Sequence, residues 1–127
     1  MTPEAACFLL KARDYLLKAH EMLEHWPDEA GRASYLAAFH AAQGLIFENC
    51  GQVVRRHAAV QAQVSRLVGQ DPNGAADARL FLGRAYNFRF VADIEAGSAA
   101  EPAPDQAALI VEAADRFVAY VTKLLAA

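Results

Sequence analysis

The amino-acid sequence predicts an all-α fold, an antiparallel up-and-down helical bundle with four long helices and one short helix. Three observations predict it. Apolar residues recur at helical spacing over long stretches, glycine and proline gather at a few positions, and no stretch sustains the apolar–polar alternation that marks a strand. Short connections favour antiparallel neighbouring helices, and a chain of 127 residues fits a single domain, residues 1–127.

The first long helix is expected to begin with Thr2 as its N-cap and Pro3 in its first turn. Threonine caps the free backbone N–H groups of a first turn, and proline has no N–H to leave unpaired there. An apolar stripe at helical spacing then continues the helix. Pro27 is expected to end it.

The remaining helices follow from similar start and stop signals. The acidic residues 28–29 suit the start of the second helix, and Gly51 is expected to stop it. A short helix is expected over about 57–68, and a long one over about 75–95. After a connection with two prolines, Asp105 is expected to cap the last helix.

Composition excludes several classes of function. Apolar residues make up 55% of the chain and the net charge is −3, which argues against a mainly electrostatic grip on nucleic acid but leaves room for a local basic patch. No apolar run approaches the ~20 residues that span a bilayer, and the N-terminus does not read as an export signal. Cys7 and Cys50 form no CxxC motif and are expected to be buried thiols. A cytoplasmic protein is the expectation.

The stretch "HEMLEH", residues 20–25, has the composition of a metal motif but not its spacing. The zincin pattern needs a second histidine four places after the first, where this chain has Glu24, and no Glu-x-x-His occurs in the sequence. We therefore expect no metal site and no cofactor. His20 with Glu24, and Glu21 with His25, are expected to pair on the helix surface.

Two stretches carry candidate site residues in the first half of the chain. In "RASYLAAFHAAQGLIFE", residues 32–48, His40 lies beside an apolar stripe, and Arg32 lies one turn before Tyr35. His40 is either a residue at the boundary of the core or part of a site, and Arg32 is either a surface charge or part of a site. In "VVRRHAA", residues 53–59, three potentially cationic residues, Arg55, Arg56 and His57, lie at the start of a helix, where the helix dipole disfavours positive charge. This corner is either solvated or a phosphate-binding patch.

A third stretch, "RFVADI" (residues 89–94), places Arg89 and Asp93 four residues apart within an apolar run. On a helix these two side chains are close enough to form an ion pair. An unpaired arginine at the edge of a buried face is costly, so the pair is expected to be structural at least, at a buried edge or a subunit interface. The alternative is that both residues face a ligand.

Taken in order, "RASYLAAFHAA" from Arg32, "RRHAAV" with His57 and "RFVADI" from Arg89 resemble the HEPN family of small helical bundles. The resemblance is closest to short stand-alone HEPN proteins often paired with a minimal nucleotidyltransferase, and it covers nearly the whole chain. It implies a homodimer in which the later-helix arginines approach a shared cleft. It also implies a nucleotidyltransferase partner, or a nucleotide or RNA ligand, in a toxin–antitoxin type system.

The chain departs from the family's patterns at several positions. Ribonuclease members carry Arg-x4–6-His, but no histidine follows Arg89 here, and Asp93 would repel a phosphodiester. Arg56 replaces the usual threonine before His57, and Ile94 replaces a tyrosine. A non-catalytic or weakly catalytic module is therefore expected.

The ligand or dimer cleft is expected where the second, third and fourth helices meet. Its candidate residues are Arg32, His40, Arg56, His57, Arg89 and Asp93. One alternative is a metal-independent ribonuclease that combines Arg89 with His57 or His40 from another helix. The other is a scaffold that only holds another protein.

Overall fold

The computed structural model describes residues 1–69, 71, 81, 83 and 104–126. Within them the chain forms α1 (Pro3–Met22), α2 (Pro27–Cys50), α3 (His57–Val68) and α5 (Pro104–Ala126), and it contains no strand. The all-α prediction is confirmed for this part of the chain. No helix in these ranges is both long enough and apolar enough to cross a membrane.

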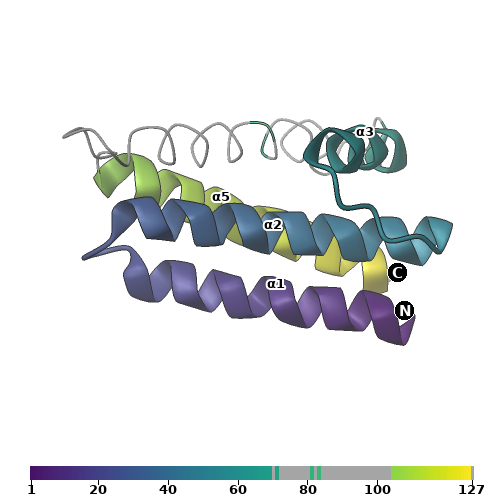
Figure 1. Ribbon diagram of the computed structural model, residues 1–127, viewed down its shortest axis with the longest axis horizontal. Helices are drawn as coiled ribbons and strands as arrows, with labels where there is room; N and C mark the ends of the chain where they lie inside the picture. Colours follow the sequence, from purple (N-terminus) through teal and green to yellow (C-terminus); the bar gives the residue numbers. More distant parts are fainter. Residues whose placement is uncertain (70, 72–80, 82, 84–103, 127) are drawn as a thin grey trace.

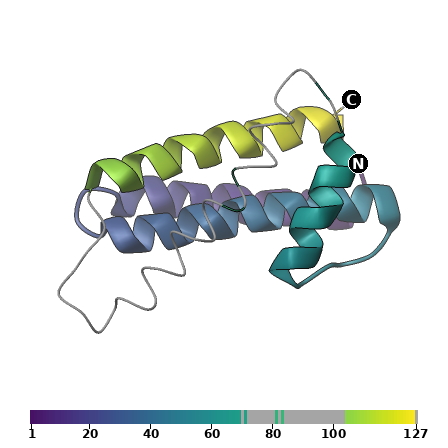
Figure 2. The ribbon, with the colours of Figure 1, turned by 90° about the horizontal axis from the view of Figure 1, so that it is seen from above.

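The second helix is the centre of the arrangement. It packs against α1, α3 and α5. Figures 1 and 2 show α1 and α2 side by side in opposite directions, with α5 running along α2 in the same direction as α2. The short α3 lies across the arrangement at the end where α2 ends. The largest fully buried apolar side chains come from α2, α3 and α5: Ile46, Val60, Val64, Val111 and Val121.

The start of α1 is held as the sequence predicts, and it is also tied to the end of α2. The Thr2 hydroxyl accepts a hydrogen bond from the Ala5 N–H at 3.2 Å, and Pro3 is in the first turn. The Thr2 backbone N–H in turn donates to Glu48 Oε2 at 2.7 Å. That bond favours the ionised carboxylate and lowers the pKa of Glu48.

Two helix boundaries differ from the prediction. The first helix ends at Met22, before Pro27, and Pro27 is the first residue of α2. Proline is tolerated at a helix start because the N–H that it lacks has no partner there. The last helix begins at Pro104, so Asp105 lies inside α5 and is not its N-cap. Two other boundaries are as predicted: Gly51 caps α2 with a φ of 70°, and α3 spans His57–Val68.

Part of the prediction concerns residues that the structure does not describe. Phe81 and Gly83 are helical, in agreement with a helix over 75–95, but the rest of that range lies outside the described residues. The same is true of most of the loop expected over 69–74.

Close approach of α1 to α2 depends on Gly44. A Cβ at this position would lie 3.1 Å from the Phe8 Cβ and 3.2 Å from the Ala5 carbonyl oxygen. Ala5 is fully buried beneath it. Glycine therefore lets the two backbones come closer than a side chain would allow.

The prediction of buried cysteines is wrong. Cys7 and Cys50 are both exposed and free. Cys7 is on the outer side of α1, and Cys50 is the last residue of α2, where the chain leaves the core. Arg66 donates a hydrogen bond to Cys50 Sγ at 3.4 Å.

Candidate functional site

A tyrosine of α2 and the first residue of α3 form the centre of the candidate site. The Tyr35 hydroxyl lies 3.0 Å from His57 Nδ1, and their ring centroids are 5.7 Å apart. Burial lowers the pKa of His57, although a hydrogen bond with Gln61 partly opposes the effect. His57 is therefore mainly neutral at pH 7.

A second link joins α2 to the backbone just before α3. Gln43 is only 5% exposed. Its Nε2 donates to the Val54 carbonyl oxygen at 2.8 Å, and its Oε1 lies 2.9 Å from His40 Nδ1. Since an amide oxygen only accepts, His40 carries its proton on Nδ1.

The imidazole of His40 lies against α1. It stacks on Tyr15 with centroids 5.5 Å apart and on Phe8 with centroids 6.4 Å apart. Burial lowers the pKa of His40, and the nearby charge of Lys11 adds to the effect, while the hydrogen bond to Gln43 opposes it. His40 and His57 thus lie on different sides of α2, and the ring of Phe39 contacts both Tyr35 and His40.

These two links hold both ends of one short segment. Gln43 binds the carbonyl of Val54, and Tyr35 binds the ring of His57. Arg55 and Arg56 lie between them and are exposed. We call residues 54–57 the clamped segment, because side chains of α2 fix both its ends while two cationic side chains point to solvent.

Charge at Arg32 is largely balanced within its own helix. Its guanidinium forms ion pairs with Glu29 and, at 3.5 Å, with Asp28. Both carboxylates lie in the first turn of α2, where the helix dipole also favours negative charge. Arg32 therefore offers less free positive charge to a ligand than Arg55 or Arg56.

The six candidate residues are thus only partly brought together. Arg56 and His57 are neighbours in the clamped segment, whereas His40 faces α1 and Arg32 is engaged by acidic side chains. Arg89 and Asp93 lie outside the described residues. Gln43 was not predicted, and Arg55 was predicted only as part of the possible phosphate-binding patch, not among the six candidates. A single glutamine in the alanine-rich face of α2 was a signal for a buried hydrogen-bonding residue.

The histidine pairing expected in "HEMLEH" is also different. His20 binds Asp115 of α5, with Nε2 2.8 Å from Oδ2, so the contact joins two helices instead of two turns of one. Among the described ranges, no group of three or more His, Cys, Asp or Glu side chains is placed to hold a metal ion.

Releasing one end of the clamped segment should expose its arginines to trypsin. In Gln43→Leu, both hydrogen bonds of the side chain are lost, so we expect faster cleavage after Arg55 and Arg56 than in the unmodified protein. Cleavage after Arg13 and Arg66, measured by mass spectrometry in the same digest, should not change. Equal acceleration at all four arginines would instead indicate general loosening of the fold.

Stability should depend on pH through His40 and His57. Both pKa values are lower in the folded protein than the usual value of 6.5, so the unfolded chain binds more protons in mildly acidic solution. The stabilisation that the two neutral imidazoles contribute to the folded protein is fully present above about pH 6.5. It is lost as pH falls from there toward the pKa values of the folded protein. Urea unfolding at pH 7.5 and 5.5 should show the loss.

A smaller loss between the two pH values is expected in His40→Gln, which removes one of the two half-buried imidazoles. His25→Gln is the matched control, because His25 is exposed and hydrated in both states. The explanation fails if His25→Gln reduces the loss as much as His40→Gln.

A search of known protein-family models finds no match to the chain, and a search of curated proteins finds none either. The resemblance to HEPN proteins therefore depends on the three sequence motifs alone.

Proposed function

We propose that the chain is a HEPN-like module, a four-long-and-one-short antiparallel bundle that dimerises and binds the phosphates of a nucleotide or RNA. It acts in the cytoplasm as a non-catalytic or weakly catalytic member of a toxin–antitoxin type system, with a minimal nucleotidyltransferase as its protein partner. In this proposal Arg89 holds phosphate or locks the dimer, and Asp93 orients Arg89.

The clamped segment is the observation that carries this proposal. Arginine suits phosphate because its planar guanidinium can donate two parallel hydrogen bonds to phosphate oxygens. A backbone already fixed by Gln43 and Tyr35 has less freedom to lose when a ligand binds. Two adjacent exposed arginines on such a backbone form a local basic patch in a chain whose net charge is −3.

The contacts of His40 and His57 are consistent with weak catalysis at most. His40 is stacked on two aromatic rings and donates to Gln43, and His57 Nδ1 is bound to Tyr35. General acid–base catalysis needs an imidazole within reach of the reacting hydroxyl. The sequence has no histidine after Arg89, where the ribonuclease members of the family carry one.

One experiment tests binding and catalysis together. A fluorescently labelled single-stranded RNA is titrated with the protein at several salt concentrations, and the same samples are then run on a denaturing gel. We expect binding that weakens as salt rises, with the RNA intact. Absence of binding at low salt would contradict the proposal.

The ribonuclease remains the second candidate because the lowered pKa of His57 keeps its imidazole neutral and able to accept a proton. That candidate predicts cleaved RNA on the gel, abolished by His57→Ala and by Arg89→Ala. A protein that neither binds nor cleaves RNA or nucleotides would instead fit the scaffold.

A further inference from the structure

A row of three half-buried rings lies beside the clamped segment and joins α1 to α2. His40 stacks on Phe8 and on Tyr15, with angles of 23° and 22° between the ring planes. The same imidazole binds Gln43, whose amide nitrogen donates to the carbonyl oxygen of Val54. A continuous series of contacts therefore runs from the clamped segment to the aromatic side chains of α1.

Two lysines of α1 lie next to these rings. Lys11 Nζ is 5.9 Å from the ring centroid of Phe8, and Lys18 Nζ is 5.0 Å from that of Tyr15. Both lysines are exposed and are seven residues apart, so they lie on one side of the helix and about 10 Å apart along its axis. We call Phe8, Lys11, Tyr15 and Lys18 the lysine–ring face.

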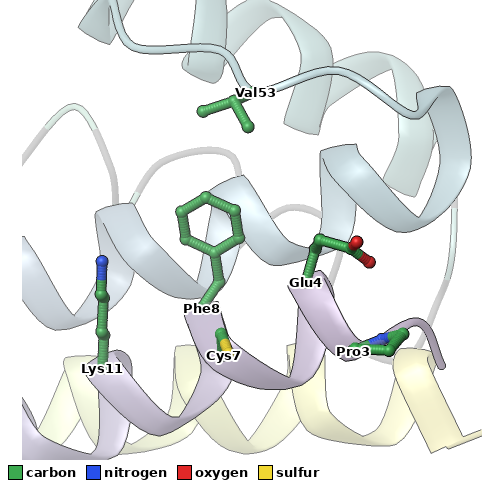
Figure 3. A pocket seen from close by; sticks show the side chains of 6 residues that line it. All are labelled: Pro3, Glu4, Cys7, Phe8, Lys11 and Val53. Atoms are coloured by element: carbon green, nitrogen blue, oxygen red, sulfur yellow. The ribbon is translucent and has the colours of Figure 1, made fainter.

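An open groove of about 440 Å³ lies between one end of the lysine–ring face and the segment that follows α2. Its lining residues are Pro3, Glu4, Cys7, Phe8 and Lys11 of α1 and Val53. Figure 3 shows the Phe8 ring pointing toward Val53 across the groove, with Lys11 on the same side of α1. Val53 is 39% exposed and directly precedes the clamped segment, so solvent-accessible apolar surface connects that segment to α1.

Positive charge borders the groove on both of these sides. Lys11 and Lys18 lie on α1, and the two exposed arginines of the clamped segment lie shortly after Val53. Among the lining residues the carboxylate is that of Glu4, at the end of the groove away from Lys18. Asp14 lies between the lysines in sequence, but helical spacing places it on the side of them away from the rings. A path from the clamped segment to Lys18 is therefore bordered by four cations and two aromatic rings.

We propose that single-stranded RNA bound at the clamped segment continues across this groove onto the lysine–ring face. The inference rests on the RNA binding of the proposed function and adds a second contact surface, on α1. Proteins that bind single strands combine a positively charged path for the backbone with aromatic side chains on which bases stack. Phe8 and Tyr15 offer rings to the bases, and the lysines offer ammonium groups to the phosphates. Repulsion by Glu4 directs the strand toward Lys18.

Removing the two lysine charges provides the first test. In Lys11→Gln/Lys18→Gln we expect the affinity for a single-stranded RNA of about 15 nucleotides to fall about fivefold. The slope of log affinity against log salt should become shallower by about one to two, because two phosphate contacts are lost. Arg13→Gln/Lys123→Gln is the matched control, since it removes two exposed positive charges from other parts of α1 and α5 and should keep most of the affinity.

The thiol of Cys7 provides the second test, because it lines the groove and is exposed and free. In Cys50→Ser protein, saturating RNA should slow the reaction of Cys7 with N-ethylmaleimide at least about fivefold, since the bound strand covers the groove. The control is a thiol on α5, placed by Glu112→Cys in a chain that also carries Cys7→Ser and Cys50→Ser. Its reaction should keep the same rate with and without RNA.

Failure of this inference is distinguishable from failure of the proposed function. Equal affinities of the two double variants for RNA, or a Cys7 that reacts equally fast with and without bound RNA, would overturn the inference. RNA would then use the clamped segment alone, and the groove would be left for another occupant such as a partner protein. RNA that does not bind the unmodified protein at low salt would contradict the proposed function and this inference together.

Discussion

Replacing Phe117 with alanine should lower the free energy of unfolding by about 3–5 kcal/mol. Phe117 is 3% exposed, belongs to the main apolar core and packs on Phe81 with ring centroids 5.6 Å apart. Truncation removes the apolar surface of a whole ring and leaves a cavity that the neighbouring side chains fill only in part. Urea unfolding followed by circular dichroism at 222 nm measures the change.

Leu109→Ala is the matched control because it removes an apolar side chain from the same helix. Leu109 is 65% exposed, so we expect a change within about 0.5 kcal/mol. Similar small effects of both substitutions would mean that α5 does not contribute Phe117 to the core. If Phe117→Ala is too unstable to purify, Phe117→Leu should show a smaller loss of the same sign.

Much of the fold was predictable because helix ends are marked by local chemistry. Thr2 caps a first turn with its own hydroxyl, and Gly51 adopts a positive φ that other residues rarely adopt. Pro27 and Asp105 were misassigned because proline and aspartate fit more than one position near a helix end. Only the path of the chain decides between those positions, and a single sequence does not contain that path.

The candidate site was less predictable because it depends on contacts between helices. Spacing placed Arg56 and His57 correctly at the start of a helix. It did not show that His40 turns toward α1, because helical periodicity gives the direction of a side chain but not the identity of the neighbour. That neighbour is set by the close packing of α1 at Gly44, a contact between residues about forty positions apart.

Removing both charges of the clamped segment should have the largest effect on function. In Arg55→Gln/Arg56→Gln we expect the affinity for single-stranded RNA at low salt to fall at least about tenfold, since hydrogen bonds to charged groups contribute roughly 1.5–3 kcal/mol each. The slope of log affinity against log salt should become shallower by about two, one for each lost phosphate contact. Fluorescence anisotropy over a range of salt concentrations measures both quantities.

The matched control removes the same two charges elsewhere. Arg13 of α1 and Arg116 of α5 are both exposed, so Arg13→Gln/Arg116→Gln changes the net charge equally. We expect it to keep most of the affinity. If both double variants lose the same affinity, attraction is spread over the whole surface and the clamped segment has no special role.

The slope of log affinity against log salt also distinguishes the effect of the two charges from the effect of a backbone that is fixed before binding. Gln43→Leu keeps Arg55 and Arg56 but frees the Val54 end of the clamped segment. If the clamp matters, this variant should bind RNA several-fold more weakly with an unchanged slope, because the same phosphates are contacted and more backbone freedom is lost on binding. An unchanged affinity would show that the two arginines act from a segment that needs no support from α2.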